Sequence, residues 1–332
     1  MIPIKPRAYV TRKIPSEALD IIAASCDYRI WDSEGEPIPR DVLEAEIGDV
    51  DGVLTLLTER VDRHLLDAAP RLKVVANMAV GYDNIDVAEC TRRGIVVTNT
   101  PGVLTETTAD LAFALILAAA RRITEAERYL RQGQWKTWSP MLLTGVDVHG
   151  ATLGIVGLGR IGEAVARRAR GFSMRVLYAN RSARPEVEAA LGIERRGLDE
   201  LLKSSDFVSI HVPLNDSTRH LIGERELNLM KPTAVLVNTS RGPVVNERDL
   251  YRALKDRRIF AAGLDVFDTE PIRSDNPLLE LDNVVLLPHI GSASIATRTQ
   301  MAVMAARNLT QVLAGQTPQN PVNPEALVDD RK

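Results

Sequence analysis

The stretch TLGIVGLGRIG at residues 152–162 decides the fold of this chain. The apolar run TLGIV predicts a buried strand, and IGEAVARRAR, which overlaps and follows the glycines, predicts a helix. In this context Gly157 would permit the tight turn, Gly159 the close approach of a pyrophosphate, and Gly162 the packing of helix on strand. The helix N-terminus would then offer free N–H groups to the phosphates. The stretch therefore predicts a dinucleotide-binding Rossmann unit, rather than glycines that merely turn a corner.

The next predicted strand, RVLYAN, ends at Asn180, where the NAD-binding version of this fold has an acidic residue. That acid accepts hydrogen bonds from the ribose hydroxyls. At about 4 Å it would repel each charge of a 2′-phosphate by roughly 4 kcal/mol, at an effective dielectric of about 20. Arg181, Ser182 and Arg184 follow instead, and they can make charge-assisted hydrogen bonds to a phosphate. We therefore expect NADP(H) as cofactor, with NADPH preferred over NADH. The alternative is a solvated surface loop that happens to be basic.

Length, charge and cysteine content narrow the class of protein. The 332 residues suggest two domains, and 45% apolar residues are typical of a globular protein. A formal charge of −3 gives no reason to expect nucleic acid or an anionic membrane as partner. No apolar run approaches the roughly 18–20 residues of a membrane span, and the opening residues MIPIKPRAYVTRKIP lack the apolar core of a signal peptide. Cys26 and Cys90 have no metal-ligand spacing. We expect a cytoplasmic protein without a metal site.

Short β-rich runs alternate with helical patterns along nearly the whole chain, which is typical of parallel sheets with crossover helices. One series ends near Thr100, an alanine-rich helix follows at about 105–122, and a second series begins at ATLGIVGLG. One more helical pattern comes after His289. The alanine-rich helix is most simply a buried core helix. Trp135 and Trp138 lie in the less regular stretch beyond it, where they could form a subunit contact or, for Trp138, line a substrate cleft.

Reactive side chains follow three strands of the second series. Arg241 comes after AVLVNTS, Glu270 after FAAGLDVF, and His289 ends NVVLLPH. Ligands of open α/β sheets bind at the carboxyl ends of the strands, so these side chains would lie on the cofactor side. Arg241 can grip a carboxylate with two parallel N–H bonds while it polarises the adjacent carbonyl. His289 can give a proton to the carbonyl oxygen, and Glu270 can orient the imidazole and stabilise its charged form. The three suit the reduction of a 2-oxo acid to a 2-hydroxy acid.

A second histidine, His211 in SIHVPL, also lies at a predicted strand end. No acid lies in an obviously matching segment, so a packed or cofactor-edge role is favoured over proton transfer. The sequence alone does not show that Arg241, Glu270 and His289 meet in space.

The chain resembles the D-2-hydroxyacid dehydrogenases, and most closely the glyoxylate/hydroxypyruvate reductases among them. The resemblance covers essentially the whole chain. It rests on GLGRIG, on NTSRGPVVNERDLYRAL with Arg241, on AAGLDVFDTEP with Glu270, on LLPHIGSAS with His289, on NMAVGYDNID at 77–86 and on NTPGVLTETTAD at 99–110.

The resemblance implies an α/β fold with two doubly wound parallel-sheet domains and a cleft between them. A flavodoxin-like substrate domain would be discontinuous, made of residues 1–100 and 289–332. A Rossmann nucleotide domain would comprise residues 101–288. Family members are typically homodimers, joined through the long helix and the segment beyond it, so a second copy of the chain is the expected protein partner.

The resemblance also implies the site residues. Arg241, Glu270 and His289 would be the catalytic residues. Substrate contacts would come from Leu57, Val80, Gly81, Arg241 and His289, with the N–H groups of Val80 and Gly81 against the carboxylate. The cofactor would contact the glycine loop, the basic turn and several strand ends, namely Gly157, Leu158, Gly159, Arg160, Ile161, Gly162, Asn180, Arg181, Ser182, Arg184, Pro213, Thr108, Thr239, Ser240, Asp265 and Gly291.

The reaction that the resemblance implies is NADPH-dependent reduction of glyoxylate to glycolate and of hydroxypyruvate to D-glycerate. Formate dehydrogenases of the wider family have a glutamine where this chain has Glu270, and phosphite dehydrogenases have a lysine where it has Val80, which disfavours both substrates. Two alternatives stay open. One is a dehydrogenase of another small D-2-hydroxy acid, and the other is a nucleotide-sensing binding protein like the corepressors of the family.

Overall fold

The computed structural model describes residues 5–327, which form two compact units. The smaller unit contains residues up to 104 and from 293 onward, and the larger unit contains residues 105–292. This division puts residues 289–292 with the larger unit. Residues 1–4 and 328–332, the two ends of the predicted substrate domain, lie outside the described residues.

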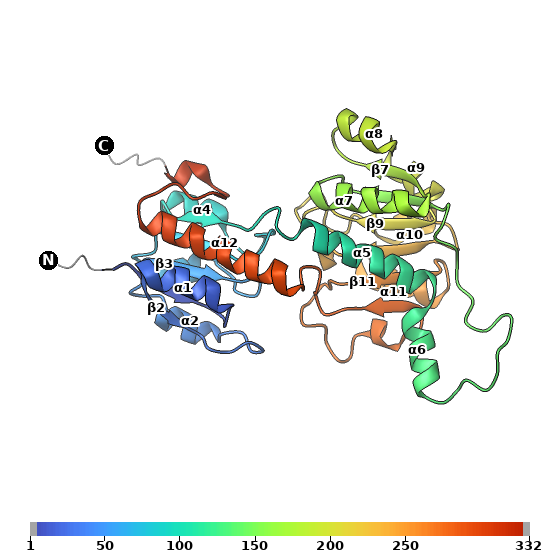
Figure 1. Cartoon of the computed structure of the whole chain (residues 1–332), viewed down its shortest axis with the longest axis horizontal. Helices are drawn as coiled ribbons and strands as arrows, with labels where there is room; N and C mark the ends of the chain where they lie inside the picture. Colours follow the sequence, from blue (N-terminus) through green and yellow to red (C-terminus); the bar gives the residue numbers. More distant parts are fainter. Residues whose placement is uncertain (1–4, 328–332) are drawn as a thin grey trace. The chain divides into compact units, whose positions relative to one another are not determined.

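The smaller unit is built on a five-stranded parallel sheet with the order β2-β1-β3-β4-β5, which is the flavodoxin-like order. Helix α12 packs on β3 and β4 and lies beside α1 (Figure 1). The strands are β1 Arg7–Val10, β2 Asp27–Ile30, β3 Gly52–Thr55, β4 Val74–Asn77 and β5 Val96–Thr98, and the helices are α1 Ser16–Ser25, α2 Arg40–Glu46, α3 Arg63–Asp67, α4 Val87–Arg92 and α12 Ile295–Leu313, with a 3₁₀ turn η4 at Pro324–Leu327.

The larger unit is built on a seven-stranded parallel sheet with the order β12-β11-β10-β9-β6-β7-β8. Counted from β6, the first six strands follow the Rossmann order, so the order reverses between β6 and β9. The strands are β6 Thr152–Val156, β7 Arg175–Ala179, β8 Glu194–Arg195, β9 Phe207–Ile210, β10 Val235–Asn238, β11 Ala261–Leu264 and β12 Val284–Leu286. The predicted α/β class with two parallel-sheet domains is confirmed.

Helices cover both faces of the larger sheet because its strands are apolar on both sides. Ile155 of β6 belongs to the core under α5 and α7, whereas Val156 belongs to the core on the other face, with α9 and α11. Helices α5 and α7 lie side by side (Figure 1). The helices are α5 Thr105–Ala120, α6 Ile123–Arg131, α7 Arg160–Ala169, α8 Pro185–Leu191, α9 Leu198–Ser204, α10 Glu224–Leu229 and α11 Glu247–Lys255, with 3₁₀ turns η1 Arg170–Phe172, η2 Gly242–Val244 and η3 Pro277–Glu280.

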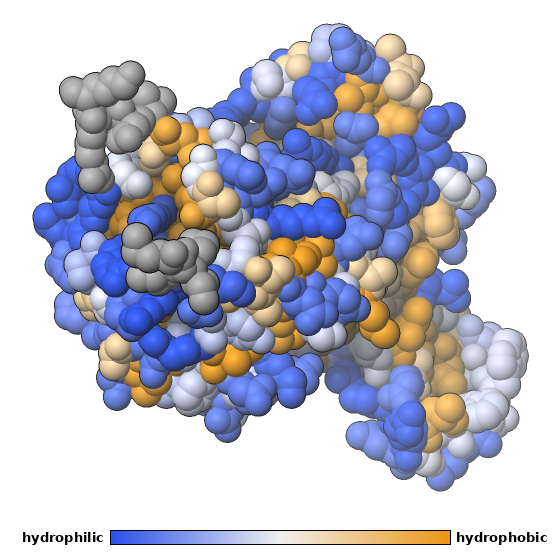
Figure 2. Space-filling view, turned by 60° about the vertical axis from the view of Figure 1, so that its left-hand side comes forward, coloured by the Kyte–Doolittle hydropathy of each residue, from blue (hydrophilic) through white to orange (hydrophobic). Residues whose placement is uncertain are grey.

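The alanine-rich helix α5 is a core helix that packs on β10 and β11. Gly263 of β11 lets α5 approach closely, because a Cβ at Gly263 would lie 3.0 Å from Leu115 Cβ. The stretch after α6 is different, since Trp135, Trp138 and Met141 are exposed there, Trp138 to 75%. On the face that Figure 2 shows, polar side chains predominate and apolar ones are interspersed. The predicted homodimer contact through α5 and this stretch stays a prediction.

The described residues contain neither a helix that could span a membrane nor a group of side chains that could hold a metal ion. No helix within residues 5–327 is long and apolar enough to cross a membrane. Over the same range, His, Cys, Asp and Glu side chains form no group of three or more that could hold a metal ion. Cys26 and Cys90 are buried, and burial raises the pKa of the Cys90 thiol to about 12.

Gly162→Ala tests the close packing of α7 on β6. The added Cβ would lie 2.3 Å from Gly157 O and 3.1 Å from Ile155 Cγ2, so the helix must shift. We expect the free energy of unfolding of the larger unit to fall by about 1–3 kcal/mol in urea denaturation. Gly171→Ala is the control, because its Cβ would meet nothing within 4 Å, and its effect should stay within about 0.5 kcal/mol. Equal stability of the two variants would contradict this account of Gly162.

Candidate functional site

The loop between β6 and α7 is shaped to receive a phosphate group. Gly157 has φ +96°, and a Cβ there would lie 2.8 Å from the carbonyl carbon of His211. Gly159 is the N-cap of α7, no side chain caps that helix, and a Cβ at Gly159 would meet nothing within 4 Å. The helix N-terminus therefore faces open space with uncapped N–H groups, which suits a pyrophosphate.

A groove of about 1060 Å³ runs from this loop along the carboxyl ends of β6, β7 and β9. It lies at the reversal of strand order, where nucleotides bind in sheets of this kind. Seven of the predicted cofactor residues line it, namely Gly157, Leu158, Gly159, Asn180, Arg181, Arg184 and Pro213.

The other predicted cofactor residues lie outside the walls of this groove. Arg160, Ile161 and Gly162 form the first turn of α7, and Ser182 lies in the turn after Asn180. Thr108, Thr239, Ser240, Asp265 and Gly291 belong to α5 and to the segments that follow β10, β11 and β12. The hydroxyl of Thr239 is buried and has no hydrogen-bond partner among residues 5–327.

The basic side chains of the turn after β7 differ in whether they are hydrogen-bonded to the protein. Asn180 Nδ2 donates to Ser182 O at 3.1 Å within the turn. Arg184 Nη1 donates to Leu158 O at 3.1 Å, which ties this side chain to the glycine loop. The guanidinium of Arg181 is exposed and makes no hydrogen bond or ion pair within residues 5–327. The turn thus presents Arg181 to the groove with its charge uncompensated.

Sequence interpretation missed two arginines, Arg195 and Arg196, that line the same groove. Strand β8 pairs with β7, with Arg195 opposite Tyr178, and so it ends beside the turn after β7. The signal was present as ERRG at 194–197, after the helix α8. It would have been found by taking these residues as the third strand of the Rossmann unit.

His211 is held as a neutral side chain at the edge of the groove. Its Nε2 lies 2.8 Å from Ser209 Oγ, and burial lowers its pKa to about 4. A histidine that stays neutral near pH 7 is a poor proton donor. The geometry favours the packed or cofactor-edge role.

Glu270 and His289 lie in direct contact beyond the ends of β11 and β12. His289 Nδ1 lies 2.6 Å from Glu270 Oε2, while Glu270 Oε1 accepts from Phe267 N–H at 3.0 Å. Asp265 holds the segment that follows His289, because its two carboxylate oxygens accept hydrogen bonds from Ile290 N–H and Gly291 N–H, both at 2.7 Å. With Nδ1 facing Glu270, Nε2 is the ring nitrogen left to exchange a proton with a ligand.

Arg241 follows β10 and lies near the same pair of residues. A Cβ at Gly242 would lie 1.9 Å from Phe267 O, so only glycine lets the chain beyond Arg241 lie on the segment that leads to Glu270. Burial raises the pKa of Glu270, but the hydrogen bond and charge of His289 and the charge of Arg241 outweigh it, so the pKa lies below its ordinary value. Glu270 is therefore a carboxylate at neutral pH, beside one cation and one histidine.

The predicted substrate residues of the smaller unit lie on two neighbouring loops, after β3 and after β4. Asn77 Nδ2 donates to Gly81 O and Asn99 Nδ2 donates to Val80 O, both at 2.9 Å. These bonds occupy the carbonyls, while the N–H groups of Val80 and Gly81 make no hydrogen bond within residues 5–327. Two successive free N–H groups are a common way to bind an anion. Leu57, on the other loop, is 39% exposed.

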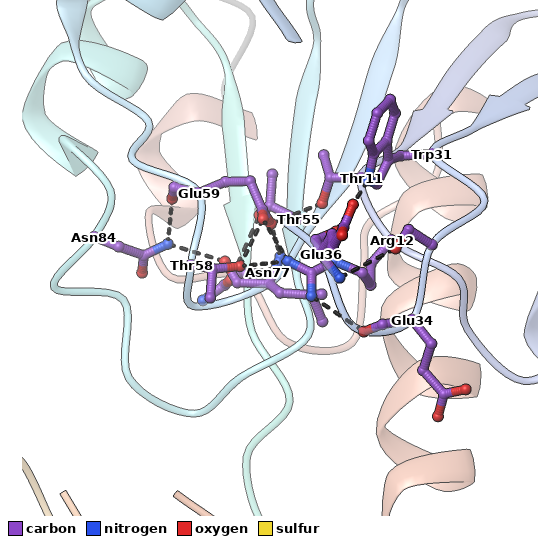
Figure 3. Close-up of polar contacts among 12 residues, drawn as sticks. Thr11, Arg12, Trp31, Glu34, Glu36, Thr55, Thr58, Glu59, Asn77 and Asn84 are labelled. Atoms are coloured by element: carbon purple, nitrogen blue, oxygen red, sulfur yellow. Dashed lines mark hydrogen bonds and ion pairs between the residues drawn. The ribbon is translucent and has the colours of Figure 1, made fainter. Parts of the chain in front are cut away.

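A buried carboxylate, Glu59, fixes the loop that carries Leu57 (Figure 3). Its Oε2 accepts from Leu56 N–H and from Thr11 Oγ1, both at 2.7 Å, and its Oε1 accepts from Thr58 Oγ1 at 2.6 Å. Arg12 Nη2 lies 3.6 Å from Oε1, and the side chains of Arg12 and Glu59 are only 12% and 3% exposed.

Asn84 connects the two loops, because its Nδ2 donates to Leu56 O at 3.1 Å and to Glu59 O at 2.8 Å. Figure 3 shows Asn84 reaching from its own loop toward the Glu59 segment. These hydrogen bonds hold together the two loops that carry the predicted substrate residues of the smaller unit.

The chain is similar to known proteins over almost its whole length. Residues 113–291 match the sequence profile of the D-isomer specific 2-hydroxyacid dehydrogenase, NAD binding domain. The chain is 55% identical over 325 residues to a glyoxylate reductase of Korarchaeum cryptofilum, with 98% of each chain covered. It is 52% identical over 328 residues to that of Thermococcus gammatolerans, again with 98% of each covered. A crystal structure of the NADPH-dependent glyoxylate/hydroxypyruvate reductase of Sinorhizobium meliloti with NADP and malonate is 35% identical, with a TM-score of 0.83 and 99% of each chain covered.

Glu59→Leu tests the buried pair of Glu59 and Arg12 in the smaller unit. The substitution would leave Arg12 buried without its carboxylate, and Arg12 Nε already lacks a partner among residues 5–327. We expect the unfolding free energy of the smaller unit to fall by about 3–5 kcal/mol in urea denaturation. Glu34→Leu is the matched control, since Glu34 gives Arg12 only its main-chain carbonyl, and the expected change is within about 0.5 kcal/mol. Unchanged stability of Glu59→Leu would show that the pair is dispensable.

Proposed function

The chain belongs to the D-isomer specific 2-hydroxyacid dehydrogenases, and from this premise we propose that it reduces glyoxylate to glycolate and hydroxypyruvate to D-glycerate with NADPH. The observation that carries the proposal is the contact of 2.6 Å between His289 and Glu270, with the charge of Arg241 acting on the same carboxylate. Full-length relatives named glyoxylate reductase support the choice of substrate.

Each of the three residues has a distinct role in the proposed reaction. When bound, the reduced nicotinamide supplies the hydride that adds to the carbonyl carbon. His289 gives the proton from Nε2 to the carbonyl oxygen, which forms the hydroxyl group of the product. Glu270 holds Nδ1 and stabilises the imidazolium before the proton leaves. Arg241 binds the substrate carboxylate with two N–H groups and polarises the carbonyl.

Other groups take part through binding alone. The glycine loop and the N-terminus of α7 would hold the pyrophosphate, and Thr239 and Asp265 would lie along the cofactor. Val80 and Gly81 would donate their N–H groups to a carboxylate, and Leu57 would contact the substrate. We also propose that two copies of the chain form a homodimer through α5 and the exposed stretch beyond α6.

The cofactor preference follows from the charges around the turn after β7. Asn180 is neutral where an NAD-dependent member has an acid, so no carboxylate stands there to repel a 2′-phosphate. Arg181 adds an uncompensated positive charge at the groove. These two features together favour NADPH over NADH.

Initial rates with glyoxylate test the cofactor proposal. NADPH and NADH are titrated separately over the same concentrations, and we expect kcat/KM to be at least tenfold higher with NADPH, about 1.4 kcal/mol. Equal values, or higher values with NADH, would contradict the role of the turn. Turnover with pyruvate but not with glyoxylate or hydroxypyruvate would point to another small 2-hydroxy acid, and nucleotide binding without turnover would point to a sensor.

His289→Ala tests the proton donor. We expect kcat to fall by about 10²–10⁴, since that is the usual contribution of a general acid. Binding of NADPH, followed by its fluorescence, should change by less than about twofold, because His289 is assigned to the substrate. His149→Ala is the control, since His149 is exposed and has no assigned role. Loss of NADPH affinity in the His289 variant, with kcat preserved, would overturn the assignment.

A further inference from the structure

Four arginines line the groove of the larger unit, and they differ in how far their charges are compensated. Arg196 Nη2 lies 2.5 Å from Glu194 Oε2, and its Nε lies 2.9 Å from Glu200 Oε1. Two carboxylates therefore neutralise Arg196. Because charge that is already paired attracts a further anion weakly, Arg196 is a poor candidate for a phosphate contact.

Arg184 is also partly occupied. Its Nη1 donates to Leu158 O at 3.1 Å, and its Nη2 lies 3.8 Å from Glu163 Oε2. The side chain of Arg184 thus bridges the turn after β7 to the glycine loop and to α7. The carboxylate of Glu163 partly compensates the charge of Arg184, which makes it a weaker phosphate contact than the sequence pattern suggests.

Arg195 differs from Arg184 and Arg196 because its partners are main-chain carbonyls and not carboxylates. Its Nη2 donates to Asn180 O and to Arg181 O, each at 3.0 Å, so it spans the main chain of the turn after β7. Carbonyl oxygens do not neutralise a guanidinium as a carboxylate does. A guanidinium has five N–H donors, and those on Nε and Nη1 of Arg195 have no partner among residues 5–327. Arg195 is therefore an exposed cation with open donors, and it is hydrogen-bonded to Asn180, the residue at the ribose-recognition position.

We propose that Arg195 is a specificity-determining residue for the 2′-phosphate of the nucleotide. It acts in two ways. An open N–H of Nη1 or Nε donates a single charge-assisted hydrogen bond to the phosphate. Its Nη2 holds the carbonyls of Asn180 and Arg181, which keeps the Arg181 side chain at the groove. The inference rests on the proposed preference for NADPH, and it moves the second phosphate contact from Arg184 to Arg195.

Nucleotide binding measured without turnover tests this assignment. Adenosine 2′,5′-bisphosphate and 5′-AMP differ only in the 2′-phosphate, and each is titrated calorimetrically into the full chain. In Arg195→Ala we expect the Kd of the bisphosphate to rise about tenfold, the loss of one charge-assisted contact, and the Kd of AMP to change by less than twofold. Arg175→Ala is the control, because Arg175 lies at the start of β7, outside the groove, and pairs with Glu194.

Three further variants separate the role of Arg195 from the overall charge of the groove. Arg184→Ala and Arg196→Ala should each weaken binding of the bisphosphate by less than about threefold, because a carboxylate already lies 3.8 Å from Arg184 Nη2 and 2.5 Å from Arg196 Nη2. Arg195→Lys keeps the charge but lacks the fixed donor geometry with which a guanidinium holds two carbonyls and still donates to a phosphate, so it should recover only part of the affinity. A loss in Arg196→Ala equal to that in Arg195→Ala would overturn the inference in favour of a general charge effect.

The remaining outcomes distinguish this inference from the proposed function. If the unaltered protein prefers the bisphosphate over AMP but Arg195→Ala binds both as before, the inference fails and the NADPH preference stands. If Arg195→Ala weakens both nucleotides equally, Arg195 supports the turn only, and the inference fails as well. If the unaltered protein binds the two nucleotides equally, the NADPH preference itself fails.

Discussion

The parallel direction of all seven strands in the larger unit is the constraint on which its candidate site depends. Parallel strands end at one edge of their sheet, so segments far apart in the sequence meet there. The glycine loop follows β6, the basic turn follows β7, Arg241 follows β10 and His289 follows β12. The reversal of strand order between β6 and β9 then opens the groove at that edge. No single segment of the chain contains both the residues of the groove and the pair of Glu270 and His289.

Close approach of backbone to backbone brings these segments into position. At Gly157 and at Gly242 a side chain would collide with the main chain of another segment, at His211 and at Phe267 respectively. The second of these contacts lets Arg241 act on Glu270. The result is electrostatic as well as steric. The pKa of the Glu270 carboxyl stays low despite burial, so Glu270 keeps its negative charge next to His289.

The two units differ in whether their charged side chains are paired with an opposite charge. In the smaller unit, Glu59 and Arg12 are buried together and their charges serve to hold a loop. At the groove of the larger unit, Arg196 is neutralised by acids, whereas Arg181 and Arg195 are exposed without a carboxylate partner among the described residues. Under our proposal an uncompensated cation recognises the additional phosphate, so a count of the arginines would not locate it.

The sequence by itself determined the parallel α/β class, the glycine loop, the core helix α5 and the positions of Arg241, Glu270 and His289 at strand ends. These features are local: apolar runs, glycine spacing and the residue that follows a strand can be recognised without any partner. Strand β8 was missed because it has two residues and exists only by pairing with β7. Tertiary structure alone decided which side chains meet, including Glu270 with His289 and Arg195 with the turn after β7. The reason is that distances between segments depend on strand order and on backbone contacts, neither of which any one segment encodes.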